Sequence, residues 1–162
     1  FFNVFFQQAL LLSTPLIGGV FFLSQVVAVP STVLAPAIAR RFGQIYTIVP
    51  TRIVGSLALV LLGFSQSLAL GLACFLLTTI VEAITAPTEM TYATQVVPSA
   101  YWARMQSLRV TGFQIPAGLA SLAAGFIIVE YSYWATFVLA GTLRMVSAVI
   151  LFTVFRGKQI EV

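Results

Sequence analysis

The chain has 162 residues, of which 60% are hydrophobic and 7% are charged, and its formal net charge is +4. Soluble domains carry about 25% charged residues, so we expect the apolar surface of this chain to face lipid. The eight basic residues are scattered, which excludes a nucleic-acid-binding patch. The chain lacks His and has one Cys, Cys74, which excludes an internal disulfide, a thiolate metal site and His-based catalysis. No cofactor or metal is expected.

The first element is an apolar run over residues 1–6 that has no basic leader. A signal peptide would begin with positively charged residues, so we interpret this run as the end of a helix whose beginning is missing. On that interpretation the sequence is a fragment of a longer protein.

Five longer apolar segments follow, and each is long enough to cross a bilayer, which takes roughly 20 residues of helix. The first contains Pro30 and Pro36, which membrane helices tolerate when neighbouring groups satisfy the freed carbonyls. Because the apolar runs are continuous rather than alternating, they predict an all-α integral membrane protein and not a β-barrel. The predicted spans are residues 16–39, 46–64, 68–97, 106–129 and 134–155.

The connections between the spans indicate how the chain is oriented. Basic residues occur at every second one: Arg40 and Arg41, then Arg104, then Arg156 and Lys158 after the last span. Cytoplasmic loops carry an excess of Lys and Arg, so these ends, and the C-terminus with them, are predicted to be cytoplasmic. We expect a multi-pass protein of the cell membrane, either a plasma membrane or a bacterial inner membrane.

Three charged residues lie deep inside the predicted spans, Glu82, Glu89 and Arg144, and Arg52 lies less deep. A charge in the hydrocarbon costs about 2.5–3.5 kcal/mol on insertion scales. Counting along the helices at about 1.5 Å per residue places Glu82 and Arg144 both roughly 20 Å from the outer surface. Glu89 shares a helix face with Glu82, and its depth resembles that of Arg52 on the preceding span. Two ion pairs are therefore predicted, Glu82 with Arg144 and Glu89 with Arg52.

These charges have two interpretations. The pairs could lock helices together, and this structural role is as good an account of Arg52 and Glu89 as any other. Alternatively, a carboxylate could face a water-filled path and bind a cationic group or a coupling proton. We favour the second role for at least one of Glu82 and Glu89.

Polar uncharged residues form a second tier of candidates for the solute pathway: Gln25, Gln114 and Asn3. Each could instead bond to a neighbouring helix, an interaction that averages about 0.6 kcal/mol in membranes. The fourth span also carries Ala117, Ser121 and Gly125, and small residues at four-residue spacing are typical of close helix packing.

The stretch from Pro36 to Gln44 resembles the loop between the second and third helices of each half of a major facilitator superfamily transporter. The family pattern is Gly-x-x-x-Asp-Arg-x-Gly-Arg-Arg, and Arg41 and Gly43 match it. Pro36, Arg40 and Gln44 replace the first Gly, the Asp and the next Arg. The stretch is most similar to the decayed copy of the motif between helices 8 and 9. In the family this loop takes part in a charge relay that uses the Asp, and Arg40 stands at that position here.

Other stretches are similar to the same family. Residues 1–6 resemble the outer end of helix 7, residues 96–108 the loop between helices 10 and 11, and residues 118–125 the small-residue face of helix 11. The resemblance implies that residues 1–162 are a C-terminal transmembrane half-bundle, comprising helices 8 to 12 and the end of helix 7. It places Glu82, Glu89, Gln25 and Gln114 on helices around a central cavity. It also assigns Arg40, Arg41 and Gly43 to a cytoplasmic gate loop.

The resemblance implies a secondary active transporter that moves a small solute by alternating access, with or without a coupling proton. Its partners would be the solute, the bilayer and the missing N-terminal half of the same chain. A non-transporting membrane scaffold or assembly subunit is the alternative. We do not expect an enzyme, because no Ser/His pair or other catalytic set occurs, and no catalytic residue is assigned.

Overall fold

The computed structural model describes residues 2–65 and 67–155. Within them the chain consists of helices joined by short turns and has no strand, which confirms the predicted all-α class. Five helices, α2 to α6, are long and apolar enough to cross a membrane. Phe1, Arg156 and Lys158 lie outside the described residues. The elements are α1 (Phe2–Gln8), α2 (Thr14–Phe42), α3 (Gln44–Gly63), α4 (Leu68–Val96), the 3₁₀ turn η1 (Ser99–Tyr101), α5 (Trp102–Glu130) and α6 (Tyr133–Phe155).

The long helices extend beyond several of the predicted spans. Helix α5 begins at Trp102 rather than at 106, and α2 runs to Phe42 rather than to 39. Hydropathy marks the part of a helix in hydrocarbon, whereas backbone hydrogen bonds continue into the interfacial turns. Helices α2, α4 and α5 have 29 residues each and are therefore about 43 Å long, longer than a hydrocarbon core of roughly 30 Å.

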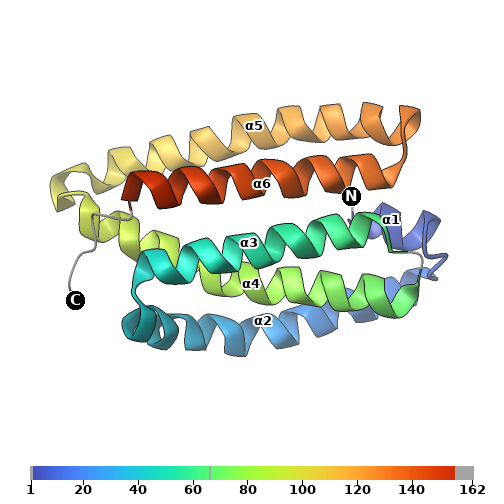
Figure 1. Cartoon of the computed structure of the whole chain (residues 1–162), viewed down its shortest axis with the longest axis horizontal. Coiled ribbons are helices and arrows are strands. Elements are labelled where there is room, and N and C mark those ends of the chain that lie inside the picture. Colours follow the sequence, from blue (N-terminus) through green and yellow to red (C-terminus); the bar gives the residue numbers. More distant parts are fainter. Residues whose placement is uncertain (1, 66, 156–162) are drawn as a thin grey trace.

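The membrane-spanning helices lie side by side in the order α5, α6, α3, α4, α2 (Figure 1). Helix α3 packs closely against both α6 and α4, and α2 packs against α4. Helix α5 contacts mainly α6, and its one buried side chain is Ala124. Gly118 and Gly125 of α5 are not in close contact with another described helix, since a Cβ added to either would have no atom within 4 Å. Four helices therefore form a packed layer, and α5 covers one edge of it.

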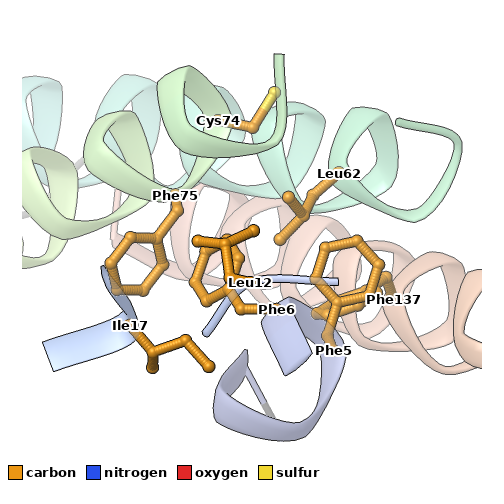
Figure 2. Close-up of a cluster of buried hydrophobic side chains, with 8 residues drawn as sticks. All are labelled: Phe5, Phe6, Leu12, Ile17, Leu62, Cys74, Phe75 and Phe137. Atoms are coloured by element: carbon orange, nitrogen blue, oxygen red, sulfur yellow. The ribbon is translucent and has the colours of Figure 1, made fainter. Parts of the chain in front are cut away.

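A cluster of aromatic and aliphatic side chains fixes the short helix α1 to one end of this layer (Figure 2). The ring of Phe6 lies edge-on to Phe75 of α4, with centroids 5.2 Å apart. The ring of Phe5 meets Phe137 of α6 in the same way at 5.1 Å. Because both phenylalanines are fully buried, α1 belongs to the same packed unit as α3, α4 and α6.

The connection between α2 and α3 is a single residue, which corrects the predicted loop over Arg40–Gly43. Arg40 and Arg41 lie in the last turn of α2, where basic side chains complement the negative end of the helix dipole. Only Gly43 is outside a helix, with φ of 87° in the left-handed region that favours glycine. Its backbone N–H donates to the carbonyl oxygen of Ala39 and so closes α2. The turn is therefore tighter than hydropathy suggests.

Helices α3 and α6 approach closely because glycine lies between them. A Cβ added to Gly141 of α6 would lie 2.9 Å from the carbonyl oxygen of Ser56 and 2.6 Å from Cγ2 of Val60. A Cβ added to Gly63 of α3 would lie 3.1 Å from the carbonyl oxygen of Trp134. Small residues allow this approach in membranes, where packing rather than water drives helix association.

We predict that Gly141→Ala destabilises the protein by about 1–3 kcal/mol, the usual cost of overpacking. The new methyl group would meet backbone atoms of α3, which cannot move aside as a flexible side chain can. Thermal unfolding of the purified protein in detergent measures the effect. Gly112→Ala is the matched control, because a Cβ there would have no atom within 4 Å. Equal melting temperatures for the two variants would contradict the close contact of α3 with α6.

Candidate functional site

A cavity of about 550 Å³ lies between α3, α4, α5 and α6. Five of its lining residues are charged, and the rest are polar, aliphatic or aromatic. Glu82 is the central residue of the 29-residue helix α4, and Arg144 is the central residue of the 23-residue helix α6. The cavity therefore lies near the middle of the helices that enclose it. We call it the charged cavity; its lining residues are Arg52, Glu82, Thr85, Ala86, Glu89, Arg109, Val110, Phe113, Gln114, Arg144 and Ser147.

Arg144 and Glu82 form an ion pair across the cavity wall, between Nη1 and Oε1. The guanidinium passes over Gly55 of α3, where an added Cβ would lie 3.0 Å from Nη2. The side chain of Arg144 is 18% exposed, whereas that of Glu82 is 54% exposed. Arg144 is therefore the enclosed partner of this ion pair, and the carboxylate of Glu82 is the accessible one.

Arg52 and Glu89 form the second ion pair, about two helical turns further along α4. Nε of Arg52 donates to Oε1 of Glu89 at 2.7 Å, and Nη2 lies 2.6 Å from the same oxygen. Nη1 of Arg52 donates to Oγ of Ser147 on α6 at 2.6 Å. One guanidinium from α3 therefore links α4 and α6. The structure brings together both pairs of residues that the depth count matched.

Arg109 is the third guanidinium of the charged cavity. Its Nη1 donates to Sδ of Met90 at 3.2 Å, and a thioether is a weak acceptor. Among the described residues, Arg109 forms no ion pair. Nε2 of Gln106, one turn away on α5, donates to the same sulfur at 3.4 Å. Helix α5 thus contacts α4 near one end of the cavity, where the side chains of Gln106 and Arg109 both donate to the sulfur of Met90.

The other predicted pathway residues divide between two groups. Gln114 lines the charged cavity together with Glu82 and Glu89. Gln25 on α2 and Asn3 on α1 are exposed and do not line it. The structure therefore does not bring Gln25 and Asn3 to the same site. Helix α2 lies on the far side of α4 from α3, and α1 lies at one end of the helix layer (Figure 1).

One of the predicted gate residues, Arg40, borders a second, smaller cavity of about 210 Å³ between α2, α3 and α4. Arg40 lines it with Gln44 and Gln95, and Nε2 of Gln44 donates to Oε1 of Gln95 at 2.8 Å. The guanidinium of Arg41 lies over the ring of Phe42 instead, 5.6 Å from its centroid. Of the two arginines, only Arg40 faces this cavity.

Sequence reasoning missed Arg109, Thr85, Phe113 and Ser147 as cavity residues. The signal for Arg109 was its spacing on the helix, because Arg109, Phe113 and Gln114 share one face of α5. Ser147 follows Arg144 by three residues and so shares its face of α6. Both residues lie about one helical turn from a predicted site residue on the same helix face, Gln114 for Arg109 and Arg144 for Ser147, so this spacing could have identified them.

Fold and cavity together define a multi-pass membrane protein with a charged site enclosed by its helices. The sequence model of the Major Facilitator Superfamily matches residues 1–161 of the chain. The chain belongs to that superfamily, which confirms the resemblance drawn from residues 36–44. Members of the superfamily are transporters rather than enzymes, and they sit in a lipid bilayer and bind small solutes. No curated protein and no solved structure matches the chain.

We predict that Arg52→Gln lowers stability by about 1–3 kcal/mol, because it leaves the carboxylate of Glu89 without its guanidinium. The lower part of that range applies because the two side chains are 22% and 24% exposed. Arg52→Gln with Glu89→Gln should recover part of the loss, since two amides can bond to each other. Thermal unfolding in detergent of the two single variants and the double variant gives the coupling energy. Strictly additive losses would show that the pair contributes nothing to stability.

Proposed function

We propose that this chain forms the C-terminal half of a secondary active transporter that moves a small solute by alternating access. The observation that carries the proposal is the charged cavity, in which four helices direct charged and polar side chains to one site near the middle of their length. In secondary transporters the solute and coupling-ion sites lie near the bilayer midplane, at the interface between two repeats. The partner repeat would be an N-terminal half of the same chain.

The decayed motif at residues 36–44 supports the C-terminal assignment, because it resembles the copy between helices 8 and 9. The distribution of basic residues supports a cytoplasmic position for the C-terminus and for the α2–α3 and α4–α5 connections. The membrane would be a cell membrane, either a plasma membrane or a bacterial inner membrane. Arg40 and Gln44 would then lie at the cytoplasmic end of the protein, near the smaller cavity that they line.

Glu82 is the residue of the charged cavity best placed to exchange a proton or contact a solute. It is more exposed than Arg144, Arg52 or Glu89 in the two ion pairs. Its carboxylate pairs with Arg144. Protonation of Glu82 would remove the negative charge that holds the guanidinium, so the ion pair would form and break as a proton leaves and binds. Intramembrane carboxylates with such partners occur in proton relays. Glu89 is less exposed than Glu82, and its partner Arg52 also donates to Ser147. A role in holding the helices together therefore suits Glu89 better.

Alternating access can be tested without knowing the solute. Ala86 lines the charged cavity and is exposed, so Ala86→Cys in a background without other cysteines should react with a membrane-impermeant thiol reagent. We predict reaction from both sides of the membrane, because the site opens alternately to each. Ser99→Cys and Ser132→Cys are the controls and should react only from the cytoplasmic and the outer side, respectively. Reaction of the Ala86→Cys variant from one side alone, without uptake of any solute, would favour the membrane scaffold instead.

We predict that Glu82→Gln abolishes the dependence of uptake on a pH gradient, because an amide cannot bind and release a proton. Proteoliposomes containing the full-length protein measure uptake over a range of solutes and imposed gradients. Glu130→Gln makes the same chemical change at the exposed end of α5 and should leave uptake unchanged. An unaltered pH dependence in the Glu82 variant would remove this residue from the coupling mechanism.

A further inference from the structure

The charged cavity has an uneven balance of charge. Among its described lining residues are three guanidiniums, from Arg52, Arg109 and Arg144, and two carboxylates, from Glu82 and Glu89. Each carboxylate forms an ion pair with one arginine, Glu89 with Arg52 and Glu82 with Arg144. One positive charge, that of Arg109, therefore has no counter-charge among the described residues.

Arg109 is an exposed guanidinium that has no carboxylate partner among the described residues. Arg109 lies seven residues inside α5 from Trp102, which is about 10 Å along the helix axis. Its described side-chain partner is the sulfur of Met90, which cannot replace an anion. Because the side chain of Arg109 is exposed to the cavity rather than buried, an anion that enters can reach it. The anion would gain a charge-assisted hydrogen bond, which is stronger than the bond to the thioether.

The groups around Arg109 suit an anion that also has an apolar part. Val110, the next residue, and Phe113, one turn further along α5, also line the cavity, and Gln114 adds an amide that can donate. A guanidinium has five donors in a planar fork, which matches the oxygens of a carboxylate or a phosphate. Charge, shape and apolar lining thus all point to one class of ligand.

We propose that the solute is a small organic anion whose carboxylate or phosphate binds Arg109 and whose apolar part packs on Phe113. This assignment rests on the proposed transport function and names the substrate class of the same site. On the opposite wall, Glu89 and Glu82 already engage the guanidiniums of Arg52 and Arg144. Arg109 is the cavity arginine that no described carboxylate engages.

Binding to the purified full-length protein tests the proposal with probes matched in size and differing in charge. Benzoate, phenyl phosphate and hexanoate are compared with benzylamine and hexylamine as cations and with benzyl alcohol as a neutral molecule. We expect at least one of the anions to bind and to bind more tightly than each cation and the alcohol. Arg109→Gln should weaken anion binding at least about tenfold, the lower end of the effect of losing a hydrogen bond to a charged group. Arg109→Lys should restore part of the affinity.

Arg104→Gln is the matched control, because Arg104 lies on the first turn of the same helix, with its guanidinium 5.9 Å from the ring centroid of Tyr101. It should bind the anions as the unchanged protein does. Three results would overturn the proposal: cations or alcohol binding as tightly as the anions, no binding by any of the three anions, or an unchanged affinity in the Arg109→Gln variant. A carboxylate supplied by the other half of the transporter would give the last of these.

Thiol labelling of the Ala86→Cys variant separates this proposal from the proposed function. If the anions fail to bind but the thiol at position 86 still reacts from both sides of the membrane, the protein alternates and only the substrate class is wrong. If that thiol reacts from one side only, transport itself fails, whatever the anions do.

Discussion

The cost of placing charge in hydrocarbon governs the arrangement of this chain. Four charged side chains of α3, α4 and α6 lie within the membrane-spanning helices, and each forms an ion pair with an opposite charge on another of these helices. Pairing requires the helices to be aligned along the membrane normal, and the central residues of α4 and α6 are the two partners Glu82 and Arg144. The ion pairs therefore fix the vertical register of three helices while they line the cavity. The same ion pairs can therefore hold the helices in register and supply charged groups to the cavity.

Glycine makes these pairs sterically possible. Gly141 lets α6 approach the backbone of α3, and Gly55 leaves room for the guanidinium of Arg144 to reach across α3 towards α4. A side chain at either position would separate the helices or displace the arginine. The approach also brings Ser147 within 2.6 Å of Arg52. Close packing and charge pairing thus depend on each other along the α3–α6 contact.

Hydropathy and depth predicted the number of spans and the height of each charge, because both depend on position along a helix. They could not predict the direction in which a side chain points around the helix axis. Lipid-facing and packed sides of these helices are equally apolar, so the sequence has no polar face to mark the outside. For this reason Gln25, which has a suitable depth, lies outside the charged cavity, and Arg109 was missed although it lines it. The tight turn at Gly43 was missed because Arg40 and Arg41 are polar yet helical.

The walls of the charged cavity differ in how firmly they are held. Helices α3, α4 and α6 are joined by two ion pairs, by close glycine contacts and by the aromatic cluster that includes α1. Helix α5, which supplies Arg109 and Gln114, has one buried side chain and contacts α4 through Met90. The free energy of a local displacement rises with the buried contacts that it breaks. Helix α5 is therefore the wall whose displacement costs least, and a ligand bound between Arg109 and the paired charges would lie between a movable wall and a fixed one.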